Sequence, residues 1–77
     1  MTKLIPVSGK QMCKLVEKLG FQRIHQVGSH VRYIHFDGRK TTVPVHANED
    51  LGKGLLLEIL NQIKLGREEY DKLRRKV

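Results

Sequence analysis

The chain opens on a pattern typical of an amphipathic helix. Four apolar residues recur at intervals of three and four, which places them on one face of an α-helix. These residues are Met12, Leu15, Val16 and Leu19. Ser8 followed three residues later by Gln11 is a capping-box pattern, in which each side chain bonds the backbone N–H of the other residue. Gly20 is typical of a helix C-terminus. The sequence therefore predicts a first helix between Ser8 and Gly20.

Three short segments with β-strand character follow, at residues 21–27, 30–36 and 40–46. Gly28-Ser29 separates the first two, and Asp37-Gly38 separates the second from the third. Both connections are typical of the tight turns that join antiparallel strands. The sequence therefore predicts a three-stranded antiparallel meander.

A second apolar stripe follows the strands and predicts a second helix, for which Asn48 or Asp50 is the expected cap. Its apolar side is formed by leucine and isoleucine residues, namely Leu51, Leu55, Leu56, Ile59, Leu60 and Ile63. After Gly66, the charge-dense segment 67–77 is expected to form a short further helix with a solvated face. The order is that of an α+β domain, α-β-β-β-α. Since both main helices are amphipathic, they should cover one face of the sheet and leave the other open.

The apolar alternation also predicts how the second and third strands pair. If Val31 lies opposite Val45 and Tyr33 opposite Val43, all four side chains share the buried face. This pairing leaves a three-residue loop, Asp37-Gly38-Arg39, between the strands. A two-residue loop would instead set a valine against a proline, so the three-residue loop is preferred.

The same register decides what lies on the open face. It sets His30 opposite His46 and Arg32 opposite Pro44, with Ile34 on the same face. Because proline has no N–H to donate, the third strand should be a sheet edge. Two facing imidazoles can act as general base and general acid for RNA cleavage, since imidazole changes its charge near neutral pH. The alternative is a pair of surface histidines without a catalytic role.

RNA cleavage of this kind needs no metal. A base takes the proton of the 2′-hydroxyl, the oxygen attacks the adjacent phosphorus, and an acid protonates the leaving oxygen. Arg32 and Lys40 would stabilise the negative charge on the phosphoryl oxygens, although any basic sheet carries such groups. Zinc is not favoured, because a continuous strand would send alternate members of the series His25, His30 and His35 to opposite faces.

Composition supports a polyanion as the partner. The 77 residues carry a net charge of +7, and the computed pI is about 9.9. Residues 1–46 hold eight basic and two acidic groups, a net of +6, whereas residues 47–77 hold seven and six, a net of +1. Nucleic acid is the commonest polyanion, and the alternative is a surface that only aids solubility. A chain this short buries a small core, which excludes most deep-pocket enzymes and any large cofactor site.

We expect the protein to work in the cytoplasm and away from membranes. Its apolar runs are far shorter than the roughly 20 residues that cross a bilayer, and the N-terminus lacks a signal-peptide pattern. The single cysteine, Cys13, cannot form an internal disulfide. Its position beside the apolar stripe favours a buried small side chain over a nucleophile.

Lys53 stands between Gly52 and Gly54 ahead of the second helix. Backbone N–H groups at a helix start can receive a phosphate. The spacing is not that of a P-loop, so a nucleotide-hydrolysing site is not supported.

Taken together, several of these motifs resemble the HicA toxin family, also called YcfA-like. They are Gly28-Ser29-His30, Asp37-Gly38, Thr42-Val43-Pro44-Val45-His46 and Leu51-Gly52-Lys53-Gly54-Leu55-Leu56. The resemblance covers residues 8–66 of a single domain, 1–77, with a C-terminal extension at 67–77. It implies a double-stranded-RNA-binding-like fold, mRNA interferase activity without a cofactor, and a HicB-type antitoxin that covers the active site.

The resemblance also implies residue roles. His30 matches the family's catalytic histidine, Gly28 and Ser29 match the turn that presents it, and His46 matches a histidine of less defined role. The residues expected to contact RNA are Gly28, Ser29, Arg23, Arg32, Arg39, Lys40 and Lys53. One departure is Leu55, where family members commonly have threonine. Two alternatives remain open, a non-catalytic RNA-binding module of the same fold and a degenerate member that acts only by pairing with a partner protein.

Overall fold

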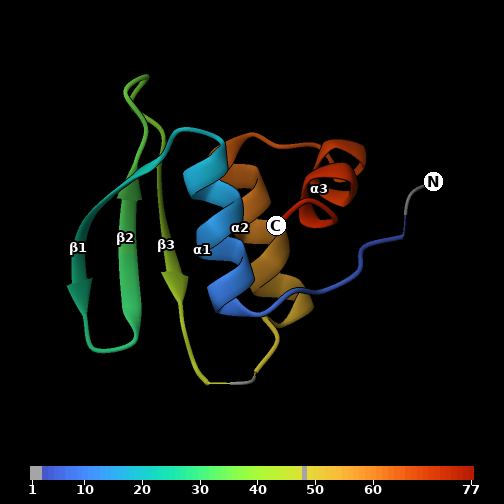
Figure 1. Ribbon diagram of the computed structural model, residues 1–77, viewed down its shortest axis with the longest axis horizontal. Helices are drawn as coiled ribbons and strands as arrows, with labels where there is room; N and C mark the ends of the chain where they lie inside the picture. The colour runs from blue at the N-terminus through green and yellow to red at the C-terminus, as the bar shows by residue number, and fades with distance from the viewer. Residues whose placement is uncertain (1–2, 48) are drawn as a thin grey trace.

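The computed structural model describes residues 3–47 and 49–77 and has the predicted α+β order, extended by a third helix (Figure 1). Its elements are α1 (Gly9–Lys18), β1 (Gln22–Val27), β2 (His30–Ile34), β3 (Lys40–Pro44), α2 (Lys53–Ile63) and α3 (Arg67–Arg74). The strands form one antiparallel sheet in the order β1-β2-β3, so β3 is an edge strand as predicted. Helices α1 and α2 pack beside β3, and α3 packs against α1. No helix among the described residues is long and apolar enough to cross a membrane.

Helix α1 begins and ends as predicted. The backbone N–H of Gln11 donates to the Ser8 hydroxyl at 3.1 Å, and the backbone N–H of Ser8 donates to the Gln11 side chain at 3.1 Å, which completes the capping box. Gly20, just after the helix, has a φ of +100°, a conformation that favours glycine. Of the predicted apolar face, Met12, Leu15 and Val16 are buried and Leu19 is half-buried, and Cys13 is buried beside them.

The predicted cap of α2 is wrong. The helix begins at Lys53 with Gly52 at the N-cap position, and among the described residues no side chain caps it. Asp50 forms an isolated antiparallel bridge with Ser8, and the N–H of Leu51 donates to the Val7 carbonyl at 2.8 Å. This pairing with the N-terminal segment keeps the chain extended through Leu51 and delays the helix. The other expected cap, Asn48, lies outside the described residues.

The predicted pairing of β2 with β3 is also wrong, by two residues. Val31 lies opposite Val43, and Tyr33 lies opposite Thr41. On the other face His30 pairs with Pro44 rather than His46. The remaining pairs on that face are Arg32 with Thr42 and Ile34 with Lys40. A shift of two keeps every side chain on its expected face, because side chains alternate with a period of two.

The connection between β2 and β3 accounts for the shift. It spans residues 35–39 rather than the predicted three, with Gly38 at a φ of +98°. The loop is closed by its own backbone bonds, since the N–H of His35 donates to the Arg39 carbonyl at 2.8 Å and the N–H of Gly38 donates to the His35 carbonyl at 2.9 Å. Strand β3 therefore ends at Pro44, and His46 lies beyond the sheet.

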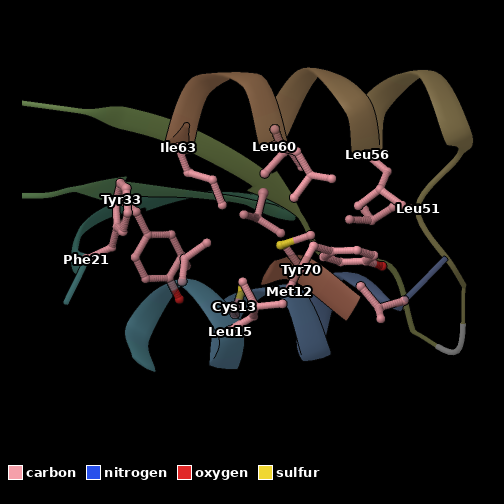
Figure 2. Close-up of a cluster of buried hydrophobic side chains, with 14 of the residues drawn as sticks. Met12, Cys13, Leu15, Phe21, Tyr33, Leu51, Leu56, Leu60, Ile63 and Tyr70 are labelled. Carbon is pink, nitrogen blue, oxygen red and sulfur yellow. The ribbon is translucent and has the colours of Figure 1, made fainter. Parts of the chain in front are cut away.

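The core lies between α1, α2 and one face of the sheet (Figure 2). Its two largest fully buried side chains are Tyr33 of β2 and Tyr70 of α3. The Tyr70 hydroxyl donates to the backbone carbonyl of Ile5, which ties the C-terminal helix to the N-terminal segment. Segment 67–77 is therefore more than a solvated helix, because one side of α3 closes the core.

The helices do not cover the whole sheet. All six residues of β1 are exposed, whereas β2 and β3 alternate between buried and outward side chains. The uncovered side of β2 and β3 is called the open face below. It carries His30, Arg32, Ile34, Lys40, Thr42 and Pro44.

Gly9 marks a close approach between the start of α1 and the end of β3. A Cβ atom on this residue would overlap the carbonyl oxygen of Pro44 and lie 3.0 Å from the Cα of Val45. Both neighbours are backbone atoms, which cannot move aside without shifting the strand end. Glycine at this position therefore allows the helix to pack directly on the chain that leads to His46.

Candidate functional site

His30 is presented by the turn between β1 and β2. Gly28 has a φ of +58° and is the first of the two loop residues, as in a type II′ hairpin turn. The Gln26 amide donates to the Gly28 carbonyl at 3.1 Å and holds the turn from within β1. His30 follows as the first residue of β2, exposed on the open face.

His30 and His46 line the same hollow, although they are not paired in the sheet. The hollow has a volume of about 360 Å³. Its lining residues come from the start of β2, the end of β3, the following loop and the start of α2. They include His30, Pro44, His46, Glu49, Asp50, Gly52 and Leu55. The two predicted histidines therefore lie close to one another, but not as a cross-strand pair, because His30 pairs with Pro44 and His46 follows the end of β3.

A second hollow, of about 230 Å³, continues from the first along β3. Its floor includes Thr42 and Pro44, one wall is His30, and the other wall is formed by outward residues of α2. These α2 residues are Leu55, Glu58 and Gln62. We call the two hollows together the β3 groove. Leu55 lines both hollows, so the groove wall is apolar at this point.

The start of α2 contributes the positive end of a helix dipole to the groove, beside Glu49 and Asp50, two acidic residues that line the same hollow. Gly52 at the N-cap contributes no side-chain hydrogen bond, and the first turn holds no acidic residue. The first N–H groups of a helix lack intrahelical partners and form the positive end of the helix dipole. Lys53 and Gly54 in this turn are exposed.

Of the predicted RNA-contacting cations, Arg32 and Lys40 share the open face with His30. Both are exposed, and both line a third hollow of about 340 Å³ that adjoins the β3 groove through Thr42 and Gln62. These two cations and the histidine therefore form one continuous surface.

Arg23 and Arg39 lie elsewhere. Arg23 pairs with Tyr33 in the sheet, on the covered side. Its guanidinium lies 3.6 Å from the Glu17 carboxylate and 3.5 Å from the Tyr33 hydroxyl. That hydroxyl donates to Glu17, and burial raises the pKa of Tyr33, so it stays a donor. Arg39 lies in the loop at the other end of β2 from His30.

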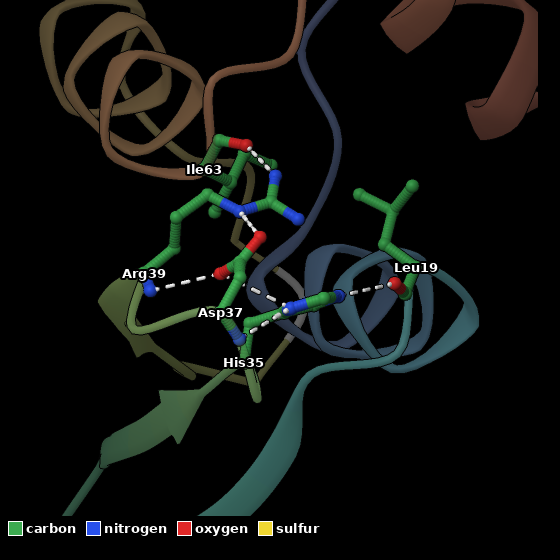
Figure 3. A network of polar contacts seen from close by, with 5 residues as sticks. All are labelled: Leu19, His35, Asp37, Arg39 and Ile63. Atoms are coloured by element: carbon green, nitrogen blue, oxygen red, sulfur yellow. Dashed lines mark hydrogen bonds and ion pairs between the residues drawn. The ribbon is translucent and has the colours of Figure 1, made fainter.

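Figure 3 shows that Arg39 belongs to a polar network that ties this loop to the helices. Its guanidinium bonds the Asp37 carboxylate at 2.8 Å and donates to the Ile63 carbonyl at the end of α2. It also lies over the Phe21 ring, 5.1 Å from the ring centre. These contacts give Arg39 a structural role.

The network also contains His35, whose role the sequence analysis missed. His35 is buried, and its Nε2 lies 3.1 Å from the Leu19 carbonyl oxygen. Its Nδ1 lies 3.2 Å from the backbone nitrogen of Asp37 and 3.1 Å from the Asp37 carboxylate. The signal was present, because His35 continues the buried alternation of Val31 and Tyr33.

The histidines of the series His25, His30 and His35 are not brought together. His35 is buried, whereas His25 and His30 are exposed on β1 and β2. Within residues 3–47 and 49–77, no three His, Cys, Asp or Glu side chains are grouped closely enough to hold a metal ion.

These features define a class, a small basic α+β domain of α-β-β-β-α order that carries a histidine-lined groove beside its open sheet face. A family model described as "HicA toxin of bacterial toxin-antitoxin" matches residues 9–65 of the 77. The chain belongs to the HicA toxin family, and the resemblance found in the sequence is confirmed. A search of curated proteins found no match. Membership of a toxin–antitoxin family implies a toxin role and an antitoxin partner.

Proposed function

We propose that this chain is a metal-independent endoribonuclease toxin that cleaves messenger or other single-stranded RNA, with His30 as its essential acid/base group. The observation that carries the proposal is the β3 groove, where exposed His30 shares a hollow with His46 and the uncapped start of α2. Membership of the HicA toxin family supports the toxin role.

The chemistry needs one base and one acid. One imidazole accepts the proton of a ribose 2′-hydroxyl while the 2′-oxygen forms a bond to the adjacent phosphorus. The bond from phosphorus to the 5′-oxygen of the next nucleotide breaks, and that oxygen takes a proton from the acid. The products are a 2′,3′-cyclic phosphate and a 5′-hydroxyl. His46 is our candidate for the second group because it lines the same hollow.

Phosphate binding falls to the positive groups around the groove. Arg32 and Lys40 share the open face with His30, and Lys53 lies at the start of α2. The unpartnered N–H groups of that helix start are suited to a phosphate oxygen. RNA binding through such groups weakens steeply as salt concentration rises, because condensed counterions are released on binding.

We further propose that a HicB-type antitoxin neutralises the toxin by covering the β3 groove. The groove lies at the surface, and His30 and His46 are both exposed. A protein seated there would exclude RNA from both histidines at once.

The test is RNA cleavage by purified protein with and without EDTA. Wild type should cut in EDTA, and His30→Ala should lose about 100-fold or more in rate, the usual contribution of a general acid or base. His25→Ala is the matched control, because His25 is an exposed histidine of the same sheet that lines none of the three hollows. Circular dichroism shows whether each variant is folded.

The outcomes separate the rival functions. If folded wild type binds RNA but does not cut it, the chain is a binding module and the catalytic proposal is wrong. If it neither binds nor cuts RNA but binds its antitoxin, it acts through its partner alone. Growth arrest on expression, relieved by His30→Ala, would support the ribonuclease.

A further inference from the structure

Two isoleucines on the outer side of the sheet, one exposed and one half-buried, have no role in the functions above. Ile24 of β1 is 55% exposed, and Ile34 of β2 lies on the open face. Both line the third hollow, together with Arg32, Lys40 and Gln62. The hollow thus has apolar walls, two cations and an amide, and it opens into the β3 groove beside His30.

The amide of Gln62 is held in one orientation. The hydroxyl of Thr41 donates to Gln62 Oε1 at 2.7 Å. Thr41 is 5% exposed, so its hydroxyl hydrogen needs a partner within the protein. Turning the amide over would let the NH₂ group donate to the Thr41 oxygen, but the hydroxyl hydrogen would then have to rotate away and would lose Gln62 as its acceptor. Gln62 Oε1 therefore stays with Thr41, and the NH₂ group is left to donate.

We propose that the third hollow is the subsite for a nucleobase next to the scissile phosphate, and that Gln62 is a specificity-determining residue that donates to this base. This inference rests on the ribonuclease proposal and deepens it. Ile24 and Ile34 provide an apolar surface for the faces of the base, and Arg32 and Lys40 hold the adjoining phosphate. His30 then meets the sugar–phosphate link in the neighbouring part of the groove.

The orientation of Gln62 predicts which bases are preferred. Guanine offers the acceptors O6 and N7, and uracil, like thymine, offers O4. At the position of guanine O6 and uracil O4, adenine and cytosine carry an amino donor instead, N6 and N4, and their acceptors lie on other atoms of the base. The Gln62 amide discriminates between bases where it meets this position. We therefore expect cleavage to favour guanine or uracil at one position beside the cut.

The experiment maps cleavage sites in a pool of random-sequence single-stranded RNA by sequencing the cut ends. Gln62→Ala should reduce the base preference at this position about fivefold to tenfold, which corresponds to the net contribution of one hydrogen bond. Gln62→Glu replaces a donor with an acceptor and should shift the preference toward cytosine or adenine. Thr41→Val keeps the shape of the side chain, frees the amide to turn, and should weaken the preference as well.

Asn61→Ala is the matched control, because Asn61 is the neighbouring exposed amide of α2 and lines none of the three hollows. It should cut with the wild-type preference. A wild-type preference that survives Gln62→Ala overturns the inference, and so does the lack of any preference beside the cut. If Gln62→Ala changes only the affinity for the antitoxin, the hollow is a protein-docking surface and the inference is wrong.

Failure of catalysis can be told apart from failure of the subsite. If wild type does not cut, fluorescence anisotropy with labelled oligo-U, oligo-A and oligo-C measures base preference in binding. Preference for oligo-U that Gln62→Ala removes would support the subsite even though the ribonuclease proposal had failed. Equal binding of the three oligonucleotides would overturn the subsite on its own.

Discussion

Replacing Gly9 by alanine tests whether the start of α1 is held against the end of β3. The new Cβ would overlap the Pro44 carbonyl oxygen and lie 3.0 Å from the Val45 Cα. Ordinary side chains do not approach backbone this closely. Either the first turn of α1 or the Pro44–Val45 backbone must move, although the Val45 N–H is bound to the Ser29 carbonyl at 2.6 Å.

The expected size follows from two opposing effects. Overpacking costs about 1–3 kcal/mol. Alanine recovers up to about 1 kcal/mol through its higher helix propensity. Because the obstructing atoms are backbone, we expect the upper part of the overpacking range and a net loss of about 2 kcal/mol in the free energy of unfolding. A small domain has little stability in reserve, so this loss is a large fraction of the total.

Urea denaturation followed by circular dichroism measures the effect. With a slope of about 1 kcal/mol per molar urea for a small domain, the midpoint of Gly9→Ala should fall by about 2 M while the slope stays the same. Gly54→Ala is the matched control, since Gly54 also lies in a first helical turn, but a Cβ added there would meet no atom of residues 3–47 and 49–77 within 4 Å. It should raise stability by about 0.5–1 kcal/mol. A Gly9→Ala midpoint at or above wild type would refute the close approach.

Two further predictions concern titratable groups. The Asp37 carboxylate accepts hydrogen bonds from the backbone N–H and the guanidinium of Arg39, and these bonds lower the Asp37 pKa below the ordinary value of 3.8. The stability that the ionised carboxylate contributes is therefore present above pH 3.8 and is lost as the pH falls through the lowered pKa. As the pH is lowered from 6 to 2, the urea midpoint should therefore fall less for Asp37→Asn than for wild type. An equal fall in both proteins would contradict the hydrogen bonds between Asp37 and Arg39. Burial raises the pKa of the Cys13 thiol, so a thiol reagent at pH 8 should label the native protein slowly and the urea-unfolded protein fast. Equal labelling rates in the two states would show that Cys13 is accessible.

The sequence by itself determined the features that depend on local periodicity. The 3.6-residue period identifies the buried face of α1 and most of that of α2, and the capping box marks where α1 begins. The exceptions in α2 are Leu51, which lies before the helix, and Leu55, which is half-buried and lines the β3 groove. The two-residue period puts His30, Arg32 and Ile34 on the open face of the sheet. That assignment held although the register was wrong, because a shift of two residues changes partners without changing faces.

Tertiary structure decided the features that depend on partners far along the chain. His46 reaches the hollow of His30 because the chain runs past the end of β3 to the start of α2. Helix α2 begins at Lys53 because residues just before it pair with the segment around Ser8. Arg39 is held by the end of α2, 24 residues away, although its sequence context resembles that of any loop cation. Local patterns reflect the backbone period and the burial of each residue, whereas these contacts depend on which distant segments the shared core brings together.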